Sequence, residues 1–136
     1  MLKILSKVDL EIRKTKIAKL FFELRMAEQV DICFMVDCTG SMSSYINEAK
    51  TVVHRVVEKL SKKFQDLKLR CAFVGYRDHC DHGDRVEVMR FTSDKDAFKA
   101  RVTSVNATGG GDEAEDIFGG LEEVNKLEWV RLYPLF

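Results

Sequence analysis

The feature that most constrains this sequence is a short apolar run followed by a long amphipathic segment. Residues 30–36 are apolar except for Asp31, and the run ends at Asp37. In residues 45–64 the apolar side chains recur at spacings of three and four, which predicts a helix with one buried face. A short apolar strand that leads into such a helix is typical of a parallel sheet covered on both faces.

The rest of the chain continues this alternation of strands and helices. The apolar periodicity predicts further strands and helices, namely strands at residues 69–76 and 85–91 and helices at residues 9–28, 95–105 and 114–127. Candidate N-cap residues precede two of the helices, namely Ser41, Ser43 and Ser44 for residues 45–64 and Thr92 and Ser93 for residues 95–105. The predicted fold class is α/β, with a central, largely parallel sheet flanked by helices.

A change in composition near Gln29 divides the chain. Residues 1–29 contain no Gly or Pro and carry seven basic against four acidic residues, whereas residues 30–136 are net acidic by three. We therefore expect an N-terminal helical segment over residues 1–29, acting as a packed or coiled connector, and one main domain over residues 30–136. A length of 136 residues allows one domain with one core.

Composition also excludes several functional classes. Lys plus Arg equals Asp plus Glu at 22 each, so no overall basic field favours nucleic acid. The longest unbroken apolar run, residues 32–36, is far shorter than the roughly 20 residues of a transmembrane helix. The four cysteines form no CxxC pair, and the first ten residues do not look like a secretory signal. We therefore expect reduced cysteines and a cytoplasmic location.

Oxygen-bearing side chains follow the first strand. Asp37, Thr39 and Ser41 place one carboxylate and two hydroxyls within five residues. These are hard ligands of the kind that Mg²⁺, Mn²⁺ or Ca²⁺ prefers, and Gly40 allows the loop to turn tightly. The loop also opens a helix, whose dipole opposes a cation, so a metal would need further carboxylates from elsewhere.

A glycine-rich loop at residues 108–112 offers a further ligand. Its three glycines allow close approach to a neighbouring segment, and Asp112 stands at its end, with Thr108 as the other candidate. Glu115 and Asp116 are interpreted instead as acidic residues in the first turn of the helix that follows, where they suit the helix dipole.

Three motifs together carry a family resemblance. FMVDCTGSM, FVGYRDH and ATGGGDEAED, in this order, resemble von Willebrand factor A-like domains, including those attached to alpha-type protein kinases. The resemblance covers about residues 29–129 and implies a Rossmann-like fold. It also implies that Asp37, Thr39 and Ser41 bind a divalent cation, Mg²⁺ first, and that Asp112 supplies the ligand of the second loop.

The resemblance implies a role in protein binding rather than catalysis. In such domains the cation keeps one position open, and a carboxylate from a partner protein fills it. The chain is then expected to be a metal-ion-dependent interaction domain and not an enzyme, serving as a targeting or regulatory module of an alpha-kinase-like protein.

The sequence departs from the family pattern near its end. Relatives continue with another central strand that ends in an acidic residue of the metal site, whereas no acidic residue follows Glu128 here. Without that strand, residues 30–36 form an exposed apolar edge, which is an aggregation hazard. We interpret the domain as incomplete at its C-terminus or as one whose sheet edge a partner completes, with a partial metal site.

Other interpretations stay open at this stage. The strand followed by DCTGS also resembles the loop of Mg²⁺-dependent aspartyl-phosphate phosphatases, in which the aspartate is the nucleophile. A metal-free interaction module would use the same fold. Asp37 would otherwise be a helix cap shared with Ser41 and Ser43.

The loop RDHCDHGD, residues 77–84, has its own alternatives. It is interpreted as a solvated hairpin loop rather than a zinc site, because adjacent residues on a short loop do not easily make a tetrahedron. Arg77 and Asp78 are interpreted as a salt-bridged pair within this loop, and neither is assigned a ligand role.

Overall fold

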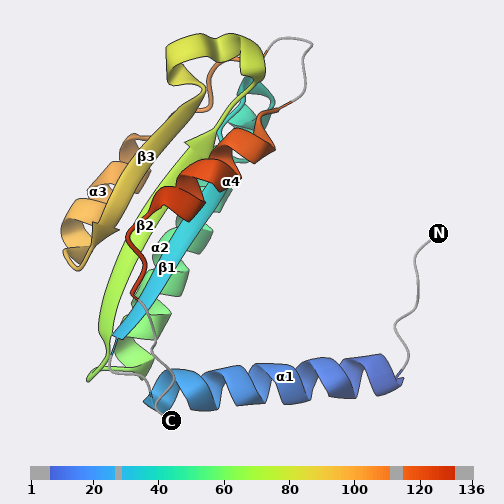
Figure 1. The fold of residues 1–136 in the computed structure, drawn as a ribbon, viewed down its shortest axis with the longest axis vertical. Helices are drawn as coiled ribbons and strands as arrows, with labels where there is room; N and C mark the ends of the chain where they lie inside the picture. Colours follow the sequence, from blue (N-terminus) through green and yellow to red (C-terminus); the bar gives the residue numbers. More distant parts are fainter. Residues whose placement is uncertain (1–6, 27–28, 111–114, 131–136) are drawn as a thin grey trace.

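The structure is a computed structural model that describes residues 7–26, 29–110 and 115–130. Its elements are, in chain order, α1 (Lys7–Met26), β1 (Gln29–Asp37), the 3₁₀ turn η1 (Gly40–Ser44), α2 (Ile46–Lys63), β2 (Lys68–Tyr76), the 3₁₀ turn η2 (His79–Asp84), β3 (Val86–Thr92), α3 (Lys95–Ser104) and α4 (Ile117–Lys126). Figure 1 shows α2 and α3 on one face of the sheet and α4 on the other, with α1 extending away from the sheet. The predicted α/β class with flanking helices is confirmed.

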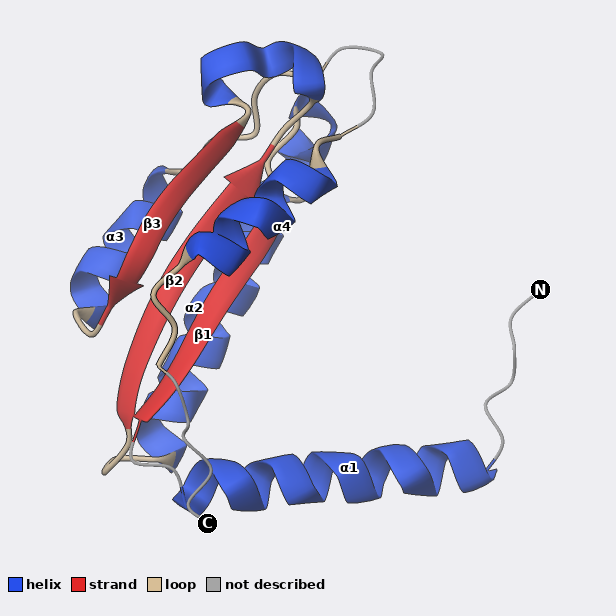
Figure 2. Ribbon diagram, viewed as in Figure 1, coloured by secondary structure: helices blue, strands red, loops and turns tan. Residues whose placement is uncertain are grey.

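The sheet is mixed and has the order β1-β2-β3. β1 and β2 are parallel and in register from the pair Gln29 and Lys68 to the pair Asp37 and Tyr76. β3 is antiparallel to β2, because the nine residues between the two strands make a turn and not a crossover helix. The two parallel strands therefore end level with each other, and Figure 2 shows them side by side in red.

The core lies between the sheet and the face formed by α2 and α3. Its largest fully buried side chains come from the sheet and from both helices, namely Val57 of α2, Phe73 of β2, and Phe98 and Val102 of α3, with Val105 just after it. Phe34 of β1 packs on Phe98 with ring centres 5.8 Å apart. The buried residues of α2 are Ile46 and Val53, which belong to the stripe predicted from its spacing, and Val57, which does not.

β1 is an edge strand in the described part of the chain. It pairs with β2 on one side, and all nine of its residues are only half-buried. This agrees with the expectation that residues 30–36 lie at an edge in the absence of a further strand. Completion of that edge by a partner stays a prediction.

The predicted caps of α2 and α3 are wrong. Ser41, Ser43 and Ser44 do not cap α2, because the chain first makes the η1 turn, and the N-cap position falls on Tyr45 without a side-chain hydrogen bond. For α3 the cap is Asp94, whose carboxylate accepts hydrogen bonds from the backbone amides of residues 96 and 97. An aspartate that reaches two free amides satisfies more donors than a single hydroxyl would.

α4 begins later than the predicted start at residue 114. Glu115 forms an isolated bridge with Asp78, and Asp116 is the N-cap, accepting a hydrogen bond of 2.8 Å from the Gly119 amide. The interpretation of Glu115 and Asp116 as first-turn residues is therefore wrong. The backbone before the helix is held by a neighbouring loop instead.

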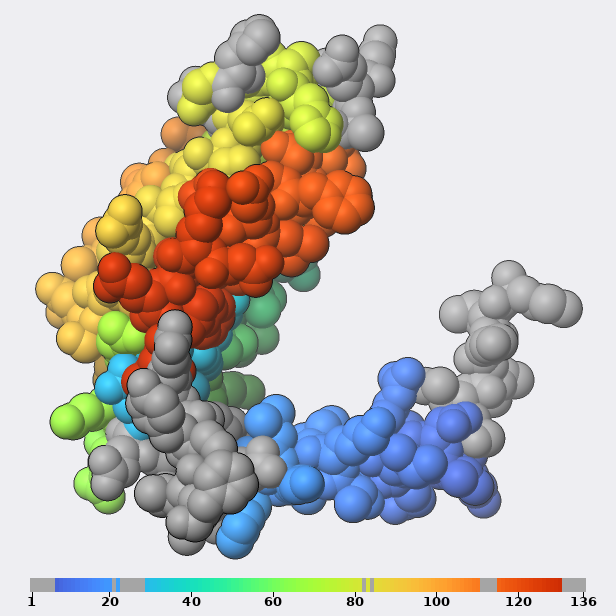
Figure 3. Space-filling model, viewed as in Figure 1, coloured from blue at the N-terminus to red at the C-terminus, as the bar shows by residue number. Residues whose placement is uncertain are grey.

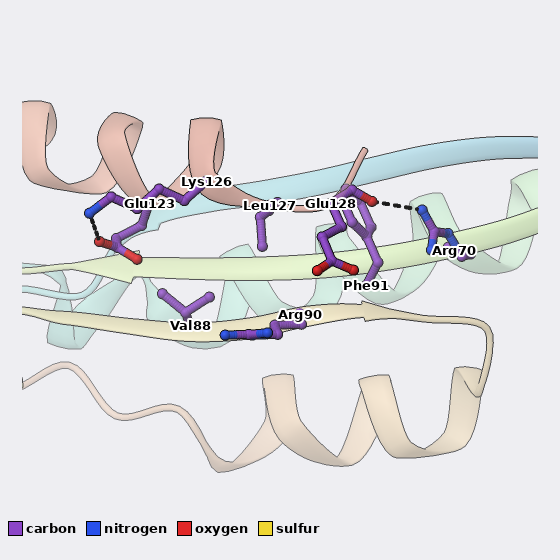
Figure 4. Close-up of a pocket in the computed structure, with 8 residues that line it drawn as sticks. All are labelled: Arg70, Val88, Arg90, Phe91, Glu123, Lys126, Leu127 and Glu128. Atoms are coloured by element: carbon purple, nitrogen blue, oxygen red, sulfur yellow. Dashed lines mark hydrogen bonds and ion pairs between the residues drawn. The ribbon is translucent and has the colours of Figure 1, made fainter. Parts of the chain in front are cut away.

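The amino-terminal end of the sheet is closed by an ion pair. Asp31 of β1 accepts two hydrogen bonds from the Arg70 guanidinium of β2, at 2.8 and 2.6 Å, and a third of 2.6 Å from the Val130 amide. Arg70 also donates to the carbonyl of Glu128 and lies 5.0 Å from the ring centre of Phe91. Figure 4 shows this arginine at one end of a cavity of about 430 Å³ between α4 and β3.

α1 contributes little to this core. Its apolar side chains are largely exposed, for example Val8 at 67% and Ile17 at 54%. Figure 3 shows the helix, in blue, standing clear of the body formed by the sheet and its covering helices. The candidate functional residues therefore lie from β1 onward.

Candidate cation site

Three loops meet where β1 and β2 end. The loop after β1 and the glycine-rich loop are joined by two backbone hydrogen bonds, Gly40 N–H to the Gly109 carbonyl and Thr108 N–H to the Cys38 carbonyl, each 3.0 Å. The loop after β2 joins through Asp81, whose carboxylate accepts a hydrogen bond of 3.2 Å from the Gly110 amide. The predicted meeting of the two distant segments around residues 37 and 110 is therefore found in the structure.

Glycine is required where the loops touch. A Cβ on Gly40 would lie 2.5 Å from the Gly109 carbonyl oxygen, a backbone atom that has no freedom to move aside. Gly109 and Gly110 have φ angles of 73° and 89°, in the region that L side chains rarely adopt. The close approach of the two loops thus depends on Gly40, Gly109 and Gly110.

Asp37, Thr39 and Ser41 are brought together as the sequence predicts. One carboxylate oxygen of Asp37 accepts hydrogen bonds from the Thr39 hydroxyl, at 2.6 Å, and from the Thr39 amide, at 2.9 Å. The Thr39 and Ser41 hydroxyl oxygens are 3.1 Å apart. Thr39 is 2% exposed, whereas Ser41 is exposed, so the three oxygens run from the interior of the loop to its surface.

The second loop is only partly described. Asp112, the predicted ligand from this loop, lies outside the described residues. Thr108, the other candidate, is exposed, and its hydroxyl accepts a hydrogen bond of 3.2 Å from the Arg77 guanidinium. The hydroxyl of Thr108 is thus engaged by an arginine.

Arg77 is a buried link between the loops and not the partner of Asp78 that we expected. Its guanidinium donates to the Glu87 carboxylate, at 2.8 Å, and to the Asn106 carbonyl, at 2.9 Å. Its backbone holds two further segments, through the carbonyl of Arg85 and the amide of Asp116. The position of the glycine-rich loop relative to the sheet therefore depends on this arginine.

Asp78 comes from the third loop and was missed as a site residue. It is 3% exposed. The point where a Cβ on Gly110 would stand is 3.6 Å from an Asp78 carboxylate oxygen and 3.7 Å from the Thr39 Cβ. The signal that would have found it is the parallel pairing of β1 and β2, because the residues after two such strands emerge at one edge.

The remaining charged groups of this end are paired with one another. Asp116, also 3% exposed, lies 2.9 Å from the Arg85 guanidinium and 3.5 Å from His79. Across the described ranges, no three His, Cys, Asp or Glu side chains gather as a metal-binding group would require. A cation at this edge would therefore depend on hydroxyl oxygens as well as carboxylates.

The nearby thiol of Cys38 belongs to the core. It is 0% exposed, its sulfur donates to the Val36 carbonyl at 3.5 Å, and burial raises its pKa to about 11. Burial has the same effect on Cys33 and Cys71, whose pKa values also rise to about 11. All four cysteines are free thiols, as predicted, and the donors at the loop edge are hard oxygens.

Comparison with known proteins gives a consistent family assignment. A sequence model described as a von Willebrand factor A domain matches residues 31–126. An alpha-protein kinase, vwkA of Dictyostelium discoideum, is 33% identical over 120 residues, which is 88% of this chain and 19% of that protein. The von Willebrand factor A domain-containing protein 7 of Rattus norvegicus is 34% identical over 91 residues, 67% of this chain and 10% of that protein.

The chain spans about a fifth or less of the length of these relatives. What it shares with them is thus one domain of a larger protein. In the described residues, none of the helices combines the length and the apolar character that crossing a membrane would need.

Proposed function

The chain belongs to the von Willebrand factor A domain family, and from this premise we propose that it is a protein-interaction domain whose binding depends on a divalent cation. Family membership supports an interaction module rather than an enzyme. The dependence on a cation rests on the loop edge described above. The observation that carries it is the cluster of the Asp37 carboxylate with the hydroxyls of Thr39 and Ser41, at 2.6 and 3.1 Å.

The donor set fits a hard cation. One carboxylate and two hydroxyls are oxygen ligands of the type that Mg²⁺ takes, and Mg²⁺ also keeps several water molecules. Asp37, Thr39 and Ser41 would hold the ion, with Asp112 as the expected ligand of the glycine-rich loop. The bound ion would supply a Lewis-acidic position for an incoming oxygen. Mn²⁺ and Ca²⁺ are the alternative ions.

The partner is proposed to be a protein that presents an Asp or Glu. A hard cation with an open position favours a carboxylate over a neutral oxygen, because the charges attract at short range. Ser41 is exposed at the loop surface, whereas Thr39 behind it is buried, so the surface side of the cluster is the side open to a partner. By its likeness to vwkA, we propose that the domain targets or regulates an alpha-kinase-like protein.

Titration with Mn²⁺, a spectroscopic substitute for Mg²⁺, tests this function. The wild-type chain should bind Mn²⁺, and Asp37→Ala should abolish binding, whereas Ser44→Ala, an exposed residue of the same turn, should leave it unchanged. Acetate is the minimal partner carboxylate, and the relaxation rate of its methyl protons should rise in the presence of both the chain and Mn²⁺, beyond that with Mn²⁺ alone. If the wild type binds no Mn²⁺, the cation-dependent function is wrong.

Two other functions give different results in the same samples. A metal-free interaction module is favoured by the lack of a three-residue His, Cys, Asp or Glu cluster among the described residues, and it predicts no metal binding at all. An aspartyl-phosphate phosphatase predicts Mg²⁺-dependent hydrolysis of p-nitrophenyl phosphate that is lost in Asp37→Asn. We expect no hydrolysis by the wild type.

A further inference from the structure

We infer that Asp78, from the loop after β2, supplies a second carboxylate to the cation site. This inference rests on the proposed function and adds a ligand from a third loop. The alignment of β1 and β2 places Asp37 beside Tyr76, and Asp78 follows two residues later. Asp78 therefore emerges at the same edge of the sheet as Thr39, two residues after Asp37.

The position of the Asp78 carboxylate supports a direct role. One of its oxygens and the Thr39 Cβ both lie less than 4 Å from the point where a Cβ on Gly110 would stand, at 3.6 and 3.7 Å. The Gly40 amide nitrogen is 3.5 Å from that point. The Asp78 carboxylate thus lies beside both the loop after β1 and the glycine-rich loop.

The backbone of Asp78 is fixed on both sides. Its amide donates a hydrogen bond of 3.1 Å to the Asp81 carboxylate, and its carbonyl accepts one of 3.1 Å from the Asp81 amide. An isolated bridge to Glu115 holds it from the other direction. The side chain is therefore held at this edge by the fold around it.

The Asp78 carboxylate lacks a partner in the described residues. It is 3% exposed, yet neither oxygen accepts a hydrogen bond or meets a cationic group there. The neighbouring cations are turned to other acids, since Arg77 bonds Glu87 and Arg85 bonds Asp116. An acid at the loop edge that has no cationic partner among the described residues is available to a cation, as expected of a ligand position.

A second carboxylate also resolves the electrostatics of the site. The η1 turn and then α2 follow Asp37 in the chain, and the start of a helix disfavours a cation. Asp37 alone offsets half the charge of a divalent ion. Asp37 and Asp78 together match it, with the hydroxyls of Thr39 and Ser41 as neutral ligands.

Asp78→Asn tests the inference, with Asp116→Asn as the matched control. Both aspartates are 3% exposed and lie at the same end of the sheet, but Asp116 is paired with Arg85. In calorimetric Mn²⁺ titrations, Asp78→Asn should bind about tenfold or more weakly, since loss of even an outer hydrogen-bond partner of a metal ligand has that effect. Asp116→Asn should bind Mn²⁺ as the wild type does.

Thermal unfolding without metal distinguishes a ligand role of Asp78 from a purely structural one. Loss of a structural residue lowers Tm, whereas loss of a metal ligand does not. Asp78→Asn breaks no ion pair to a described residue, so its Tm should equal or exceed that of the wild type. Asp116→Asn breaks an ion pair and should lower Tm. A lower metal-free Tm for Asp78→Asn, with unchanged Mn²⁺ affinity, would show a packing role and overturn the inference.

A second variant covers the case in which Asp78→Asn does not fold. Asp78→Cys places a thiolate at the same position, and soft ligands favour Cd²⁺ over Mn²⁺. Cd²⁺ should then produce the ultraviolet charge-transfer absorption of a sulfur–cadmium bond, which the wild type lacks. Wild-type binding of Mn²⁺ without this signal overturns the inference alone, whereas absence of Mn²⁺ binding by the wild type overturns the proposed function as well.

Discussion

The two ends of the β1–β2 pair hold buried carboxylates in opposite circumstances. At the amino-terminal end, the Asp31 side chain is 3% exposed and accepts hydrogen bonds from Arg70, Gln29 and the Val130 amide. At the carboxyl-terminal end, Asp78 is 3% exposed as a whole residue, whereas Asp31 as a whole residue is half-buried. The Asp78 carboxylate accepts no hydrogen bond from the described residues. An aspartate thus stabilises the fold at one end, and at the other end its carboxylate oxygens are available to a ligand.

The difference distinguishes the end of the β1–β2 pair that stabilises the fold from the end that is proposed to bind a cation. Arg70 ties three elements together, since it bonds Asp31 of β1 and the Glu128 carbonyl after α4 and stacks on Phe91 of β3. In the described part of the chain, no ion pair of this kind reaches Asp37 or Asp78 at the loop edge. A region whose charges are all satisfied is stable without a ligand, whereas one with an unpaired buried acid is stabilised by a cation.

The largest loss of stability is expected from breaking the Asp31–Arg70 ion pair at the amino-terminal end. Asp31→Ala leaves Arg70 without its two short bonds, and loss of one partner of a buried pair costs about 3 kcal/mol, the lower part of the usual range because the Arg70 side chain is 30% exposed. Urea unfolding measures this change. Mn²⁺ affinity of the folded protein should not change, since Asp31 lies at the opposite end of β1. A metal-binding defect in this variant would contradict the separation of the two ends.

The next effect comes from separating the loops at the binding end. Gly40→Ala places a Cβ 2.5 Å from the Gly109 carbonyl oxygen, so one loop must shift. We expect a loss of about 2 kcal/mol in the free energy of unfolding, in the range of overpacking, together with weaker Mn²⁺ binding. Gly83→Ala is the matched control, because no atom lies within 4 Å of its added Cβ. Equal behaviour of the two variants would mean that loop contact is not needed.

Sequence patterns predicted most of the fold because burial repeats along each element. The strands around residues 30–36 and 69–76 and the helix at residues 45–64 were correct to within one residue at each end. The caps were wrong because a cap depends on the path of the loop before it, as the η1 turn before α2 illustrates. Local patterns record periodicity well and loop geometry poorly.

The site was predicted in part for a similar reason. Asp37, Thr39 and Ser41 are close in sequence, so their convergence follows from one loop, and the structure brings them together. Asp78 belongs to another loop, and its neighbour Arg77 suggested an ion pair. Only the tertiary structure shows that Arg77 bonds Glu87 and Asn106 instead. Sequence alone does not rank competing partners for one charge.

A smaller effect is expected from a carboxylate that is paired at the binding end. Asp116→Ala removes the cap of α4 and the ion pair with Arg85, whose side chain is 46% exposed. The cap contributes about 1 kcal/mol, and an ion pair with so exposed a partner adds little. Chemical unfolding should show this loss, whereas Asp116→Asn should retain the cap and lose less. If both variants lost the same amount, the ion pair and not the cap would hold α4.

The smallest effect is a difference in acid stability between the two ends. Burial of Asp31 opposes its ionisation, but hydrogen bonds from Arg70, Val130 and Gln29 hold its pKa below the ordinary value of 3.8. A group whose pKa is lowered by folding stabilises the protein above the unfolded-state pKa and loses that contribution as pH falls through the folded-state pKa. The free energy of unfolding should therefore decline below about pH 4 in the wild type and decline less steeply in Asp31→Asn. Urea unfolding at pH 6, 4 and 3 compares the two proteins, and parallel declines would mean that Asp31 does not control acid stability.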